Sequence, residues 1–105
     1  MAWFVLILAG LMETGWAVGL KLAGVRPGWW IYTVTGVLML GSFAGLSYAM
    51  RGLPIGVAYP VWTGIGAVGT VIVGVVMFQQ KIGILTISGV TLLIIGMILI
   101  GLETK

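Results

Sequence analysis

Charged side chains are scarce in this sequence, which holds five Lys or Arg and two Asp or Glu residues among 105. A soluble domain devotes about a quarter of its residues to the charged types. With 61% hydrophobic and 7% charged residues, this chain has too little polar material to cover a water-facing surface. The composition therefore indicates a protein whose solvent is lipid.

Histidine and cysteine are absent. Their absence excludes most zinc, haem and iron–sulfur sites and the usual nucleophile–base pairs of enzymes, so we expect neither a cofactor nor enzymatic activity. The glycine-rich run GIGAVG is no dinucleotide fingerprint, because it lies inside an apolar segment rather than after a strand. The net charge of +3 comes from cations spaced singly between apolar runs, so no nucleic-acid partner is expected.

Long apolar runs are what the sequence has in abundance. Breakers and polar joints divide it into four segments, at about residues 2–20, 29–50, 54–78 and 82–102. Each has about 20 residues, the length that a helix needs to cross roughly 30 Å of hydrocarbon. Backbone in lipid must satisfy its own hydrogen bonds, and the runs lack the alternation of barrel strands. The sequence therefore predicts an all-α membrane protein, with a single four-helix transmembrane domain over residues 1–105.

The cations bear on the orientation of these helices. Short connections force an up-down-up-down order, which places Lys21, Arg26 and Lys81 on one side of the membrane and Arg51 and Lys105 on the other. Three against two is a weak bias, so the positive-inside rule hardly selects one orientation. A chain that inserts both ways round permits an antiparallel dimer. A single orientation with three cations inside is the alternative.

Glu13 is the only ionisable side chain well inside any of the four segments. A charged group near the middle of the membrane costs on the order of 2.5–3.5 kcal/mol, which makes a functional role the first hypothesis. One carboxyl group can hold a proton or an organic cation, and competition between them is sufficient for exchange. The alternative is a protonated Glu that only bonds a neighbouring helix.

Gly10 and Trp16 share the helix face of Glu13, because they stand three residues before and after it. Gly10 permits close approach to the carboxylate, although simple packing explains a glycine equally well. Trp16 offers a flat wall for a cation. We take both as candidate binding residues.

The second and third segments supply further candidates. Tyr59 and Trp62 share a face of the third segment, where they can stack on a cation or donate hydrogen bonds to a carboxylate. Ser42, in the second segment, is a candidate hydrogen-bond partner for Glu13. The alternative for Ser42 is a bond to its own backbone, as is common for serine in membrane helices.

Prolines and glycines mark two further features. Pro60, Gly64 and Gly66 in the third segment predict a hinge, because proline removes a helix hydrogen bond and glycines thin the helix. Close helix packing is the alternative explanation for the glycines. Gly89 and Gly96 lie seven residues apart on one face of the fourth segment, where we predict the dimer interface.

These residues stand in the motifs AGLMETGWAVGLK, LPIGVAYPVWTGIGA and GVTLLIIG, in this order. With them the chain resembles the small multidrug resistance family over nearly its whole length. The resemblance implies an antiparallel, dual-topology homodimer in the bacterial inner membrane, although some relatives function only as heterodimers. It also implies that the helix-1 glutamate, Glu13 here, alternates between protons and substrate, and that the glycine pair of the fourth helix makes the dimer. At Pro60 the family normally has a small residue.

The subtype follows from smaller features. Guanidinium exporters of the family carry Gly and Trp where Gly10 and Trp16 stand, and Ser, Tyr and Trp where Ser42, Tyr59 and Trp62 stand. Quaternary-ammonium exporters usually have Gly at the position of Trp16. The resemblance thus implies a proton-coupled antiporter that exports guanidinium or small guanidinyl cations. The alternatives are an exporter of quaternary ammonium and other hydrophobic drug cations, a passive channel, and a non-transporting membrane subunit.

Overall fold

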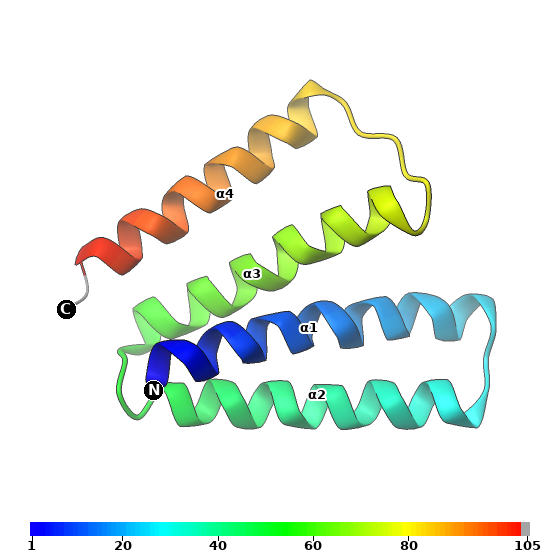
Figure 1. Ribbon diagram of the computed structural model, residues 1–105, viewed down its shortest axis with the longest axis horizontal. Coiled ribbons are helices and arrows are strands. Elements are labelled where there is room, and N and C mark those ends of the chain that lie inside the picture. The colour runs from blue at the N-terminus through cyan, green and yellow to red at the C-terminus, as the bar shows by residue number, and fades with distance from the viewer. Residues whose placement is uncertain (104–105) are drawn as a thin grey trace.

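A computed structural model describes residues 1–103 of the chain, and in that range it contains helices and no strand. The helices are α1 (Ala2–Val25), α2 (Trp29–Ala49), α3 (Ile55–Val76) and α4 (Ile84–Glu103), which run in alternating directions (Figure 1). All four are long and apolar enough to cross a membrane. The prediction of an all-α membrane protein with four transmembrane helices is therefore confirmed. Lys105, which entered the comparison of loop charges, lies outside the described residues.

The first helix is longer than the sequence indicated. It was expected to end near residue 20, but α1 continues through Lys21 to Val25. Lysine is a good helix former, and the helix continues through Gly24 toward Pro27. A residue before proline is disfavoured in a helix, and Arg26 accordingly leaves the helical region with φ −134° and ψ 76°.

The ends of the last two helices differ from expectation by one or two residues. α3 runs from Ile55 to Val76, inside the expected range of 54–78, and Gln79 then adopts a left-handed φ of 55° that turns the chain. This turn also delays the start of α4. Pro60 lies inside α3, and the helix continues without a break on both sides of it.

Glycines bring α1 and α2 close together along their length (Figure 1). α1 carries Gly15 and Gly19, and α2 carries Gly41 and Gly45, so each pair lies four residues apart on one helix face. A Cβ added to Gly45 would lie 2.9 Å from the Cβ of Ala9. Because lipid provides little hydrophobic force between helices, such close packing of small residues is what stabilises their contact. α1 and α2 thus form the tightly packed layer of the fold.

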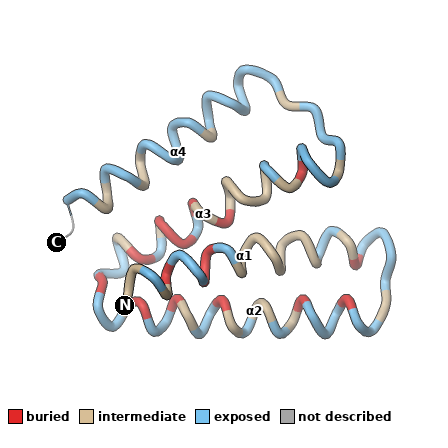
Figure 2. The backbone as a smooth tube through the Cα atoms, viewed as in Figure 1, coloured by how far each residue is buried: buried red, intermediate tan, exposed pale blue. Residues whose placement is uncertain are grey.

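The buried core lies where the first half of α3 meets this layer (Figure 2). Its members come from the first half of α1, the end of α2, the connection that follows it and the first half of α3: Leu6, Ala9, Leu46, Ala49, Leu53, Ala58, Val61 and Trp62. Beyond this core, α3 diverges from α1 toward its C-terminal end (Figure 1). α4 packs against α3, and none of its residues is buried within the single chain (Figure 2).

We expect the substitution Gly45→Leu to destabilise the fold by about 1–3 kcal/mol, because a side chain there must force α1 away from α2. The matched control is Gly36→Leu in the same helix, since an added Cβ at Gly36 meets no atom within 4 Å. Unfolding by SDS in mixed micelles, followed by circular dichroism, measures the difference. Equal stability of the two variants would contradict the packing described for Gly45.

Candidate functional site

Glu13 lies at the middle of α1 and faces α3, where its side chain rests directly on the backbone of Gly66. A Cβ at Gly66 would collide with the carboxyl group of Glu13, so only glycine leaves room for it. One turn further along, Gly69 accommodates the side chain of Thr14 in the same way, and the Thr14 hydroxyl donates a hydrogen bond of 3.5 Å to the carbonyl of Gly66. The sequence predicted Gly66 only as part of a hinge, whereas in the structure the carboxyl group of Glu13 packs against it.

Two buried polar atoms of the site have no hydrogen-bond partner. They are Oε1 of Glu13, an acceptor when the carboxyl is ionised, and Nε1 of Trp16, a donor. Leaving such an atom buried and unpaired costs about 1–3 kcal/mol. Because both stand on one helix, three residues apart, the unsatisfied groups are concentrated in one place. This concentration is typical of a binding site rather than of a packed helix interface.

Ser42 has partners other than the one expected from the sequence. Its hydroxyl is fully buried, donates a hydrogen bond of 2.7 Å to the carbonyl of Ala9, and accepts one of 3.0 Å from Nε1 of Trp62. It therefore bonds neither Glu13 nor the backbone of its own helix, because its single proton is committed to the carbonyl one turn before Glu13. Ser42 fixes the ring of Trp62, and it links all three helices of the site.

Four aromatic rings form a chain of contacts across the site. Trp16 and Phe43 have ring centroids 6.0 Å apart at 65°, Phe43 and Trp62 lie 5.9 Å apart, and Tyr59 and Trp62 lie 5.6 Å apart. Trp62 is 6% exposed, while Tyr59 at the end of the chain is 51% exposed. Sequence reasoning missed Phe43, which connects the two tryptophans, because a phenylalanine in a lipid-facing helix gives no signal of its own.

Gly10 and Gly64 serve helix contacts in this conformation. Gly10 receives the side chain of Ile65 from α3, so it does not open the approach to the carboxylate. Gly64 receives Met97 from α4. These contacts favour the packing explanation for both glycines, and the hinge at Pro60, Gly64 and Gly66 stays a prediction.

Gly89 and Gly96 lie on α4, where an added Cβ would meet no atom within 4 Å at either position. The single chain therefore gives neither glycine a packing partner, and the predicted dimer interface at this pair remains a prediction. Among residues 1–103 no group of His, Cys, Asp or Glu side chains is arranged to hold a metal ion.

These features define a small multi-pass membrane protein with one ionisable group midway along α1 and a chain of aromatic rings from three helices. Comparison with known proteins assigns it further. The family model of the small multidrug resistance protein matches residues 1–93. A guanidinium exporter of Escherichia coli strain K12 is 41% identical over 108 aligned residues, which cover 99% of both chains. Guanidinium exporters of Proteus vulgaris and Yersinia pseudotuberculosis are 43% and 44% identical, over 93% of this chain and 94% of their own.

The chain belongs to the small multidrug resistance family. It is therefore a transport protein of the bacterial inner membrane and not an enzyme, as the resemblance implied.

We expect Ser42→Ala to destabilise the fold by about 1–3 kcal/mol, since it leaves the buried N–H of Trp62 without an acceptor. Thr33→Ala is the control, because the exposed hydroxyl of Thr33 bonds only the carbonyl of Trp29 in its own helix. The same SDS titration, followed by circular dichroism, compares the two variants. If the two variants were equally stable, the hydrogen bond between Ser42 and Trp62 would not contribute to the free energy of unfolding.

Proposed function

We propose that this chain is a proton-coupled antiporter that exports guanidinium or small guanidinyl cations by competition between proton and cation at Glu13. The observation that supports this most directly is the buried, unpaired Oε1 of Glu13 beside the unpaired Nε1 of Trp16. The relatives named guanidinium exporters, which align over nearly the whole chain, support the choice of substrate.

The chemistry of guanidinium suits this site. The ion is planar, keeps its positive charge at any physiological pH, and presents N–H donors in a fork that matches a carboxylate. Glu13 supplies the carboxylate, and the rings of Trp16 and Phe43 supply apolar walls against which a flat cation can lie.

Exchange follows from using one carboxyl group for both ligands. A bound cation requires the carboxylate to be ionised, so the proton must leave before the cation can enter. If the site changes sides of the membrane only while it holds a proton or a cation, inward movement of protons drives outward movement of the cation. Each tenfold difference in proton concentration supplies about 1.4 kcal/mol per proton for this work.

We further propose that the working unit is an antiparallel homodimer. α4 has no buried residue in the single chain, and its glycine pair leaves a smooth strip without neighbouring atoms. Small residues at such a strip let two membrane helices pack closely. The loop cations divide three against two, Lys21, Arg26 and Lys81 against Arg51 and Lys105, and this weak bias supports insertion in both orientations.

Glu13→Gln should abolish proton-coupled transport, because the amide keeps the size of the side chain but can neither ionise nor release a proton. We would reconstitute the protein in liposomes and record substrate-triggered proton-coupled currents with guanidinium, phenylguanidinium and tetraethylammonium. The control is Glu103→Gln, which removes the same charge at the end of α4. Coupled currents that persist in Glu13→Gln would refute the mechanism.

The substrate panel separates the alternatives. Currents with the two guanidinium compounds support the proposed substrate class. Currents with tetraethylammonium alone would keep the coupling mechanism and assign the protein to the exporters of quaternary ammonium cations. If all three compounds fail, a missing partner subunit becomes the explanation to test.

Gly96→Leu should shift the dimer–monomer equilibrium toward monomer by about tenfold or more, since overpacking an interface costs about 1–3 kcal/mol. The substitution leaves the single chain undisturbed, because an added Cβ at Gly96 meets no atom within 4 Å. Gly83→Leu, just before α4, has equally open space and is the control. Cross-linking in dilute bilayers measures the dimer fraction. An unchanged fraction in Gly96→Leu would place the dimer contact elsewhere.

A further inference from the structure

A cleft of about 490 Å³ opens between α1 and α3 where the two helices diverge. Ala17, Val18 and Lys21 of α1 form one wall, and Thr70 and Val73 of α3 form the other. Phe78 and Gln80, from the connection to α4, lie at its outer end. The cleft thus has apolar walls and a polar mouth that contains a single charged side chain.

The inner end of this cleft lies next to the carboxyl site. α1 and α3 meet in successive layers, in which Glu13 rests on Gly66 and Thr14 rests on Gly69. Ala17 stands one turn beyond Glu13 on the same helix face, and Thr70 stands one turn beyond Gly66. The cleft therefore begins at the layer beyond Thr14, and the contact of Thr14 with Gly69 separates it from Glu13 in this conformation. Lys21 lies on the side of this layer from which a cation would approach Glu13 from this end of α1.

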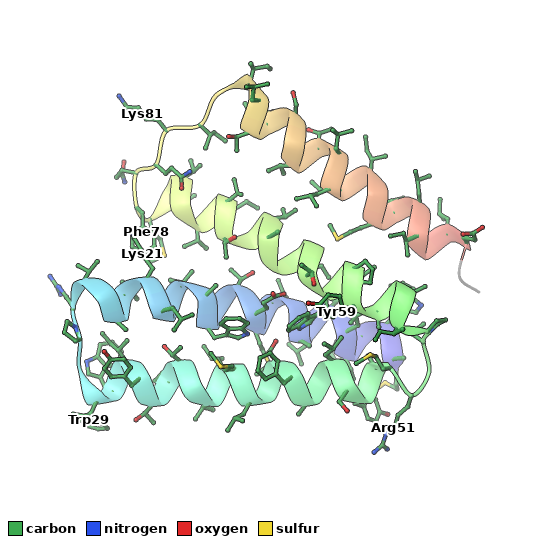
Figure 3. The ribbon with its side chains drawn as sticks, turned by 180° about the vertical axis from the view of Figure 1, so that it is seen from behind. Lys21, Trp29, Arg51, Tyr59, Phe78 and Lys81 are labelled. Atoms are coloured by element: carbon green, nitrogen blue, oxygen red, sulfur yellow. The ribbon has the colours of Figure 1, made fainter. Side chains whose placement is uncertain are left out.

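Lys21 stands at the mouth of the cleft with its charge uncompensated. Figure 3 shows its side chain reaching between the ends of α1 and α3, beside Phe78. The chain has only two acidic residues. Glu103 lies at the opposite end of the bundle, near the C-terminus (Figure 1), and Glu13 lies two turns deeper on α1. The other groups that line the cleft are neutral.

We propose that Lys21 is a specificity-determining residue that selects singly charged over doubly charged cations by repelling them at the mouth of the cleft. This inference rests on one part of the proposed function, namely that cations bind at Glu13. The energy of repulsion by a fixed charge is proportional to the charge of the ligand. The fold-change in binding of a dication is therefore the square of the fold-change for a monocation. Size or shape selection has no such dependence.

The expected size of the effect follows from the distance. Lys21 is eight residues from Glu13, which corresponds to roughly 12 Å along a helix. At that separation, a unit charge between water and protein interior changes the binding of another unit charge by about two- to tenfold. Lys21 should therefore weaken the binding of a dication, relative to a monocation of equal size, by the same factor. Salt should weaken it, because the screening length at physiological ionic strength is about 8 Å.

The test compares two ligands of equal shape, n-butylguanidinium and 3-aminopropylguanidinium, which differ in a terminal methyl or ammonium group. Initial rates of transport at low concentration in proteoliposomes give the ratio of dication to monocation for each variant. We expect Lys21→Gln to raise this ratio about two- to tenfold, and Lys21→Arg to leave it unchanged. Both ligands meet the same protein in each measurement, so the ratio does not depend on how much of it is folded.

Lys81→Gln is the matched control. It removes the same charge at the same end of the bundle, but Lys81 points away from the cleft (Figure 3). If Lys81→Gln raised the ratio as much as Lys21→Gln, or if neither changed it, the proposal would be wrong. High salt should raise the wild-type ratio toward that of Lys21→Gln, and a salt-independent ratio would also refute charge repulsion.

Two further outcomes are covered by the same design. Lys21→Gln could abolish transport of both ligands. Binding is then measured by quenching of tryptophan fluorescence, and the ratio of the two dissociation constants replaces the ratio of transport rates. The proposal requires the same two- to tenfold change in this ratio. If wild-type protein carries tetraethylammonium but no guanidinium compound, the proposed substrate fails separately. The charge comparison is then made with singly and doubly charged quaternary ammonium ions of equal length.

Discussion

The carboxyl group of Glu13, placed in the middle of a helix that crosses lipid, imposes the requirements that the surrounding structure meets. A charge there is costly unless protein shelters it. The shelter is the bare backbone of Gly66, and any larger residue at that position would displace the carboxyl group. The contact in turn requires α1 and α3 to cross closely at this level, which Gly10 and Gly69 permit. Glu13 thus accounts for the glycine at position 66, while Gly10 and Gly69 accommodate Ile65 and Thr14 in the same helix contact.

The helices divide into parts with different degrees of contact. α1 and α2 are held together by small residues over their full length, and the hydrogen bonds of Ser42 connect this layer to Trp62 on α3. α3 leaves the layer beyond the core, which opens the cleft toward Lys21. α4 has no buried residue in the single chain. The first half of α3 is thus fixed to the layer, while its second half lies apart from it.

Much of the fold was predictable from the sequence, and the reason is the solvent. In lipid only self-bonded helices span the membrane, so apolar runs of about 20 residues define the elements almost without tertiary information. The ends were less predictable, because lysine can belong to a helix whose charged tip reaches water, as Lys21 does in α1. The sequence also singled out Glu13, Trp16 and Trp62 as candidate site residues, since polar or amphipathic side chains deep in an apolar run stand out.

The sequence by itself determined that the chain crosses the membrane four times and carries one acidic group at mid-depth, because both follow from the local balance of apolar and charged residues. Only the tertiary structure decided which partner each site residue has. Ser42 bonds Ala9 and Trp62 rather than Glu13, and Phe43 joins the two tryptophans. Helical spacing fixes which residues share a face of one helix. The rotation and depth of one helix against another depend on the packing of side chains and glycines across all of them.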